Sequence, residues 1–244
     1  MKFSQSIIAL SAAAGLASAA PPYGEKVSAD ETNHVKFLSD ALTACTYAFG
    51  VTDVATFLAT ASILDGVGVS AYLAAAADIM SKTYLKAAGS ILTVEARHSA
   101  YLRYSLKEAP FAQSFDAPLS IDEVYTLAAG FITSCPASNT KLPVKAFPSL
   151  KLDPKAGTVK AGTTVTLLTP GYTLKAAQGV ATIYAAFIAV TGPTFVVASP
   201  VAGGFSVTIP MGFSGQSYAV LTSCNETVSD DTTAAGPAII EISS

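Results

Sequence analysis

The stretch Ile91–Arg103, ILTVEARHSAYLR, decides how this 244-residue chain is expected to fold. Its apolar residues recur at helical spacing, and Glu95 and His98 fall on the same seam as they do. The chain has only one other histidine, His34, and it too stands three residues after a glutamate, Glu31. With seven glutamates in the chain, chance would place both pairs at this offset in roughly one such sequence in a thousand. The two Glu-x-x-His pairs therefore point to one shared site.

The chain around these pairs reads as three helices with polar residues on their inward seams. Helices are expected over residues 28–49, 54–80 and 82–106, because apolar residues repeat every three or four positions in each. Asp65 lies on the inward seam of the second helix, and Tyr72 lies one heptad beyond it. Acidic and imidazole groups thus occupy the seams of all three helices.

Two glycines interrupt the second helix near its middle. Gly66 and Gly68 each lower helix propensity by roughly 1 kcal/mol relative to alanine. Because a glycine has no side chain, another helix or a ligand can approach the backbone closely there.

A carboxylate or imidazole turned into a helical core is costly unless it is paired, protonated or bound to a metal. Four-helix di-metal bundles solve this with a Glu-x-x-His pair on each of two helices and one further carboxylate on each of the other two. This chain supplies five of those six positions, and we predict them as metal ligands. The five are Glu31, His34, Asp65, Glu95 and His98.

Simpler roles stay open for these residues. Glu31 is also placed to complete a capping box with Ser28, and both histidines can be ordinary core or surface residues. Asp65 can hydrogen-bond Ser62 or Tyr72. Tyr72 itself is either a core tyrosine or a hydrogen-bond donor to the ligands of a metal.

Composition excludes several function classes. Charged residues make up 13% of the chain and its pI is near 5.3, and no basic cluster is present to attract a phosphate backbone. We therefore expect no nucleic-acid partner. The sequence also lacks a glycine-rich phosphate loop, cysteine pairs with zinc spacing and a Gly-x-Ser-x-Gly elbow. A Ser/His/Asp triad stays open, although the paired glutamates explain both histidines better.

The N-terminus has the pattern of a secretory signal over residues 1–19. Lys2 precedes an apolar run over residues 7–16, and a small-x-small cleavage site follows at residues 17–19. The apolar run is too short to span a membrane, and no later stretch qualifies as a clear span. The tail AIIEISS carries no hydrophobic extension for a lipid anchor. We expect a secreted protein, extracellular or in a cell wall, without a membrane partner.

Three cysteines would then meet an oxidising compartment. One disulfide and one remaining thiol is the simplest arrangement. Cys45 and Cys135 each end a predicted helix, which favours that pair, and a Cys135–Cys224 bridge is the alternative. Asn225 begins the glycosylation sequon Asn-Glu-Thr, which fits a secreted glycoprotein.

The hydrophobic period changes in the second half of the chain. A shorter helix is expected over residues 121–133, opened by a capping box of Ser120 with Glu123. Short β-branched segments separated by glycine, proline and serine then predict a small antiparallel β-sandwich. The expected divisions are a signal peptide over 1–19, a helical domain over 28–135, a proline-rich linker over 136–156 and the sandwich over 157–244. The fold class is thus α+β in two domains.

Three segments carry a resemblance to a known family. They are ETNHVKFL from Glu31, FLATASILDGVGVSAYLAAAADI from Phe57 and AAGSILTVEARHSAYLR from Ala87. Together they resemble the ferritin-like domain shared by secreted fungal late-sexual-development or stress-response proteins and plant desiccation-related proteins. The likeness covers residues 29–148, with GVGVSAYL and EARH as its most specific parts. The β-rich tail resembles the C-terminal region of the fungal members.

The resemblance assigns ligand roles and also marks two departures. Glu31 and His34 would act from the family's second helix, Asp65 from its third, and Glu95 and His98 from its fourth. The family has an earlier helix with a lone glutamate, which this chain lacks, so the bundle is expected without its first helix. This chain also has an aspartate, Asp65, at the position where the family usually has a glutamate. The shorter side chain reduces the reach of the carboxylate by about 1.5 Å. The place of the missing first helix in the bundle would be filled by residues 121–133, by a second chain, or by a part of a longer protein.

Two functions are expected from this reading. The first is a secreted ferritin-like protein with a partial di-metal site for iron or manganese, associated with stress or development and without robust enzymatic activity. The second is a non-catalytic extracellular or cell-wall protein whose metal site is vestigial and holds no metal. A cell-wall or extracellular partner and a homo-oligomer both stay open.

Overall fold

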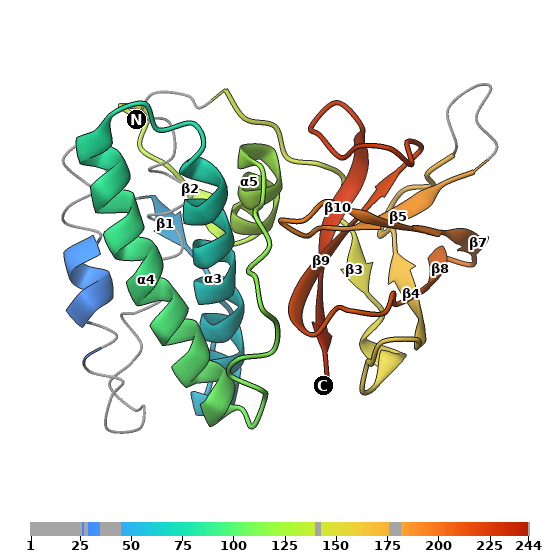
Figure 1. Cartoon of the computed structure of the whole chain (residues 1–244), viewed down its shortest axis with the longest axis horizontal. Coiled ribbons are helices and arrows are strands. Elements are labelled where there is room, and N and C mark those ends of the chain that lie inside the picture. Colours follow the sequence, from blue (N-terminus) through green and yellow to red (C-terminus); the bar gives the residue numbers. More distant parts are fainter. Residues whose placement is uncertain (1–25, 27–28, 35–44, 140–142, 176–181, 244) are drawn as a thin grey trace. The chain divides into compact units, whose positions relative to one another are not determined.

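The structure, a computed structural model, describes residues 26, 29–34, 45–139, 143–175 and 182–243. The chain divides into two compact units (Figure 1). Residues 1–110 with 127–144 form the first unit, and residues 111–126 with 145–244 form the second. The predicted signal peptide over residues 1–19 lies outside the described residues and stays a prediction.

Two long helices dominate the first unit. α3 spans Val54–Ala75 and α4 spans Lys82–Ser105, and they pack side by side along their lengths (Figure 1). Asp53 caps α3, because its side chain accepts from the Thr56 N–H at 2.8 Å while the Thr56 hydroxyl accepts from the Asp53 N–H at 3.1 Å. Both helices lie where the sequence predicts them, although α3 ends five residues early.

The first predicted helix needs correction at its C-terminal end. Residues 29–34 are helical, and residues 35–44 lie outside the described part. The helix was expected to continue to residue 49, but Thr46–Tyr47 form strand β1, which pairs antiparallel with β2 at Ile132–Ser134. The disulfide between Cys45 and Cys135 joins the two strands at this point. The paired, β-branched and aromatic residues here favour extended backbone over helix.

The predicted helix over residues 121–133 is correspondingly shorter. α5 spans Ile121–Ala129, since Gly130 and the β-branched Ile132 and Thr133 favour leaving the helix. Its capping box forms as the sequence predicts: the Ser120 N–H donates to Glu123 Oε2 at 2.7 Å, and the Glu123 N–H donates to the Ser120 hydroxyl at 3.2 Å. The division between the two units falls inside α5.

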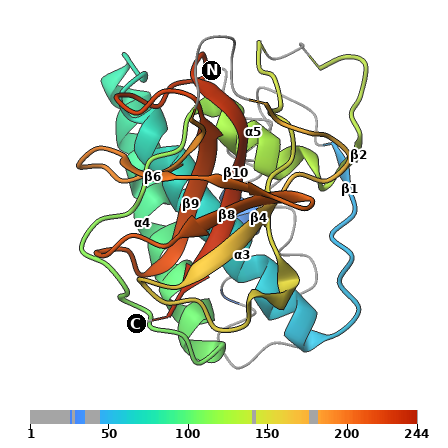
Figure 2. The same cartoon turned by 90° about the vertical axis from the view of Figure 1, so that its right-hand side faces the viewer.

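The second unit is built on two four-stranded antiparallel sheets, seen in Figure 2. One sheet has the order β10-β9-β5-β6, and the other has the order β3-β4-β8-β7. The strands are β3 Lys151–Leu152, β4 Thr164–Leu168, β5 Tyr184–Phe187, β6 Thr194–Val197, β7 Ser199–Val201, β8 Gly204–Thr208, β9 Gly215–Thr222 and β10 Thr233–Ile242. Inward side chains of both sheets form one apolar core, which includes Leu167, Phe187, Val207 and Leu221. The predicted β-sandwich is the observed architecture.

Part of the proline-rich segment belongs to this second unit. Its Lys145 N–H donates to the Asp122 carboxylate at 3.0 Å, and its Phe147 N–H donates to the Thr126 hydroxyl at 2.9 Å. Leu150 is buried in the sandwich core. Residues 145–156 are thus held by hydrogen bonds and packing within the unit.

Among the described helices, α3 alone is long and apolar enough to pass a length and composition test for a membrane span. That test is weak evidence, because core helices of soluble proteins pass it as well. The helix also buries the carboxyl group of Asp65.

Candidate metal centre

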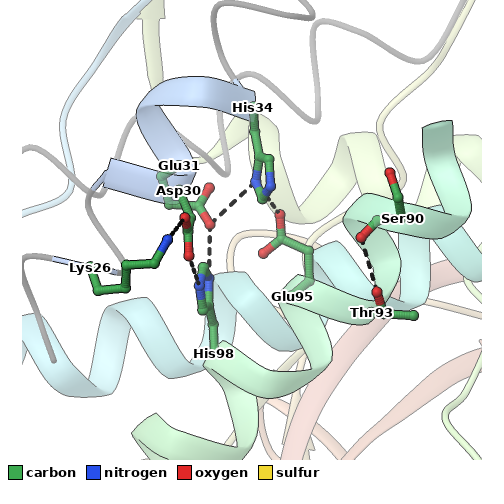
Figure 3. A network of polar contacts seen from close by, with 8 residues as sticks. All are labelled: Lys26, Asp30, Glu31, His34, Ser90, Thr93, Glu95 and His98. Carbon is green, nitrogen blue, oxygen red and sulfur yellow. Dashed lines mark hydrogen bonds and ion pairs between the residues drawn. The ribbon is translucent and has the colours of Figure 1, made fainter.

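Five acidic and imidazole side chains meet in the first unit. Glu95 and His98 project from neighbouring turns of α4, and Glu31 and His34 project from the short helical segment over residues 29–34 (Figure 3). Asp65 reaches the same place from the middle of α3. All five are buried, with exposed fractions between 3% for Glu31 and 9% for His34.

His34 lies between two carboxylates from different helical segments. Its Nδ1 atom is 3.6 Å from Glu31 Oε1 and 3.3 Å from Glu95 Oε1 (Figure 3). Burial acts to lower the pKa of this imidazole, but hydrogen bonding and attraction to Glu31 and Glu95 raise the pKa to about 10. The imidazole is therefore protonated at neutral pH in the metal-free protein.

His98 has an acidic partner on each ring nitrogen. Its Nδ1 atom is 3.0 Å from Glu31 Oε1, and its Nε2 atom is 3.5 Å from Asp30 Oδ2. Asp30 in turn pairs with Lys26, four residues earlier (Figure 3). This chain of contacts leads from the buried Glu31 outward to the exposed Lys26.

Asp65 is the least satisfied member of the group. Its Oδ2 atom is fully buried and has no hydrogen-bond partner among the residues that the structure describes. Burial raises the pKa of its carboxyl group well above the usual range, and the negative charges of Glu95 and Glu31 raise it further. An unpaired buried carboxyl costs about 1–3 kcal/mol, and a cation bound beside Asp65 would favour its ionised form.

The pKa values of the other two carboxylates shift in opposite directions. Burial raises the pKa of Glu95, and the hydrogen bond to His34 only partly offsets it. Burial also acts to raise the pKa of Glu31, but its bonds to His34 and His98 outweigh burial and lower the pKa. The protonated His34 thus lies beside Glu31 and Glu95, while the pKa of Asp65 and that of Glu95 stay raised.

The donor atoms are close enough to hold metal. Glu31, His34 and Glu95 form one set, and Asp65, Glu95 and His98 form another, with the donor atoms of each set within 4.8 Å of one another. Glu95 belongs to both sets. Carboxylate oxygens and imidazole nitrogens are ligands that suit iron and manganese. The Asp65 oxygen, which lacks a partner within the described part of the chain, and the chemistry of the donors therefore fit a metal.

The structure brings all five predicted ligands together, and sequence reasoning missed two residues beside them. Asp30 and Lys26 complete the chain of contacts from His98 to the surface. The only signal for them in the sequence is their i, i+4 spacing, which favours an ion pair on a helix. Tyr72, for which both a core role and a donor role are open in the sequence, is 4% exposed, and its hydroxyl has no hydrogen-bond partner in the described part of the chain.

The remaining predicted sites lie outside this group. Cys45 and Cys135, which are 90 positions apart in the sequence, form the favoured disulfide. Cys224 is half-buried and not disulfide-bonded. Asn225, next to it, is exposed, and its glycosylation stays a prediction.

A comparison with protein families agrees with this geometry. Residues 2–108 match the family model described as a ferritin-like domain. That span includes α3, α4 and all five candidate ligands. No curated protein matches the chain.

The family match covers the N-terminal part of the chain. The chain has a helical N-terminal ferritin-like region, followed by antiparallel β-sheets that form a β-rich C-terminal domain. The ferritin-like region buries carboxylate and histidine groups that can hold a metal.

Proposed function

We propose that this chain is a secreted ferritin-like protein that binds iron or manganese at a partial di-metal site, in a stress or developmental role. The observation that carries the proposal is the buried oxygen of Asp65 beside Glu95 and His98, which has no hydrogen-bond partner among the described residues. A native protein keeps such a group when a ligand or chemical role compensates its cost.

The two donor sets suggest how the residues would divide. Glu31 and His34 would serve one ion, Asp65 and His98 would serve another, and Glu95 would be common to both. When bound, iron or manganese supplies Lewis-acid and redox chemistry toward oxygen species. The protein's own contribution is burial, which excludes water, together with the fixed orientation of each imidazole between its carboxylates.

Secretion is supported by the sequence pattern over residues 1–19 and by the Cys45–Cys135 disulfide. Disulfides persist mainly in oxidising compartments. The stress or developmental role rests on the resemblance of three segments to secreted fungal and plant proteins.

A second candidate function is a non-catalytic extracellular or cell-wall protein with a vestigial site. The position of His34 favours it, because a protonated imidazole between Glu31 and Glu95 offsets buried negative charge without a metal. In this case the buried carboxylates and imidazoles would serve only to hold residues 29–34 against α4.

Metal analysis of the purified, secreted protein separates the two. The proposal expects iron or manganese at one to two ions per chain in the wild type, with loss in Glu95→Ala and in His98→Ala. The exposed variant Asp78→Ala is the matched control and should keep the wild-type content. Absence of metal in the wild type, with unchanged stability in both ligand variants, would support the vestigial site instead.

A further inference from the structure

Among the described acidic residues around the candidate metal centre, Asp30 is the most exposed. Its side chain is 23% exposed, whereas the side chains of Glu31 and Glu95 are 4% and 6% exposed. Asp65 is buried as well. Asp30 belongs to neither donor set, so the predicted ligands do not account for its place beside them.

His98 connects Asp30 to the buried part of the site. Its Nε2 atom is 3.5 Å from Asp30 Oδ2, and its Nδ1 atom is 3.0 Å from Glu31 Oε1 (Figure 3). Asp30 and Glu31 are neighbours in the sequence, but consecutive residues of a helix point about 100° apart. A half-exposed carboxylate and a buried one therefore meet at the same imidazole ring.

Lys26 occupies the outer side of Asp30. Its side chain is 71% exposed, and its ammonium group contacts Asp30 Oδ1 while Asp30 Oδ2 faces His98 (Figure 3). Exposed ion pairs of this kind contribute little to stability. The Lys26–Asp30 pair can therefore open without loss of the fold.

The place of a charge in a site decides which rate constant it affects. A charge at the rim acts mainly on the association rate constant, kon, whereas a buried partner acts mainly on the dissociation rate constant, koff. A carboxylate at the rim raises the local concentration of cations, and carboxylate oxygens suit divalent ions such as Mn²⁺. Asp30 has this position, and the ammonium of Lys26 competes for the same carboxylate.

We propose that Asp30 is the outer docking point at which a hydrated divalent cation first meets the site, and that Lys26 restricts this docking by pairing with the Asp30 carboxylate. From Asp30, the ring of His98 leads directly to Glu31. This inference rests on the proposed function, because it requires that the five buried ligands bind a metal.

The rates of Mn²⁺ binding to the full-length protein test this role. Mixing Mn²⁺-loaded protein with excess fluorescent chelator gives koff, competition at equilibrium gives Kd, and the ratio of koff to Kd gives kon. Asp30→Asn should lower kon by about 10-fold, while koff changes by less than about twofold. Lys26→Gln should raise kon by about 2–5-fold, because the Asp30 carboxylate then has no competing ammonium.

Ionic strength gives a second readout. Salt screens exposed charges beyond about 10 Å at about 0.1 M, so both changes in kon should shrink when salt is raised from about 0.02 M to about 0.5 M. If Asp30 served only to orient His98, Asp30→Asn would raise koff, and kon would stay at the wild-type value at every salt concentration. That result would overturn the docking role.

Asp78→Asn and Lys82→Gln are the matched controls for net charge. Both residues are exposed and lie in the first unit, and Lys82 begins α4 about 24 Å along the helix axis from His98. Both variants should keep the wild-type kon.

The remaining outcomes separate this inference from the proposed function. Metal binding by the wild type, with equal kon in all the variants or with changes as large in the controls, would overturn the docking role and leave the metal site in place. A wild-type protein that takes up neither Mn²⁺ nor iron would overturn the proposed function and the docking role together.

Discussion

Glu31 Oε1 lies 3.0 Å from His98 Nδ1, although 67 positions separate the two residues in the sequence. This contact joins the first Glu-x-x-His pair to the second. His34 makes the reciprocal approach to Glu95 at 3.3 Å. Each pair therefore supplies a carboxylate to the histidine of the other, and the two pairs behave as one buried electrostatic unit.

Asp65→Asn should separate metal binding from folding. The substitution removes a carboxyl group whose pKa burial raises while nearly keeping its shape. The metal-free protein should unfold within about 1 kcal/mol of the wild type, and the gain in Tm on adding Mn²⁺ or iron should largely disappear, because a ligand stabilises only the state that binds it. Differential scanning calorimetry with and without a chelator measures both quantities, and an undiminished metal-dependent gain would remove Asp65 from the ligand set.

Asp30→Asn should weaken metal binding from outside the ligand set. Its carboxylate faces His98 Nε2 at 3.5 Å and would orient the imidazole. We expect a rise of about 10-fold in the Kd for Mn²⁺, with little change in metal-free stability, because Asp30 belongs to a partly exposed ion pair. Competition with a fluorescent chelator gives the affinity. Lys26→Gln, which leaves Asp30 in place, is the control and should change the affinity less.

The Cys45–Cys135 disulfide should contribute strongly to stability. It joins residues that are 90 positions apart in the sequence, and chain entropy predicts a stabilisation of about 4–5 kcal/mol for a loop of that length. The double variant Cys45→Ala/Cys135→Ala should lose that much in urea unfolding. Cys224→Ala, which touches no disulfide, should match the wild type. Equal midpoints for the wild type and the double variant would contradict a stabilising bridge.

Glu123 should make the second unit less stable as pH rises. Burial, together with the nearby charge of Asp230, raises the pKa of its carboxyl group to about 7 from the ordinary value of 4.5. A raised carboxyl pKa means that the folded state binds the proton more tightly. The stabilisation is fully present below pH 4.5, declines between pH 4.5 and 7, and is absent above pH 7.

The matched substitution isolates this effect. The difference in unfolding free energy between the wild type and Glu123→Gln should fall by on the order of 3 kcal/mol from pH 4.5 to pH 7. Denaturant titrations at several pH values measure it, with the exposed Glu226→Gln as control. A difference that stays constant with pH would show that Glu123 titrates normally in the folded protein.

The residues of the site could be predicted because helical spacing fixes which side chains share a seam. Glu95 and His98 on α4 and Asp65 on α3 follow from that periodicity alone. The spacing cannot show that Asp30, one residue outside the predicted Glu31 pair, turns toward His98. That depends on how residues 29–34 are rotated against α4, which is a matter of tertiary packing.

Local propensity predicts the individual elements of the fold, but it does not predict pairing between distant parts of the chain. The alternation of β-branched residues predicts the sandwich, but the short pairing of Thr46–Tyr47 with Ile132–Ser134 depends on a contact between distant parts of the chain. The helical spacing of apolar residues continues up to residue 49, so the sequence pattern predicts helix where this strand pairing forms. The disulfide between Cys45 and Cys135 was the one sequence feature that pointed to this contact.

In the proposed site, Glu95 would hold metal together with Glu31, the two histidines and Asp65. Anomalous diffraction at the iron and manganese edges, on crystals of the wild-type protein and of Glu95→Ala, tests it most directly. We expect anomalous density in contact with the Glu95 carboxylate in the wild type and none at that place in the variant. Crystals grown with either metal that show no anomalous density among these side chains would contradict it.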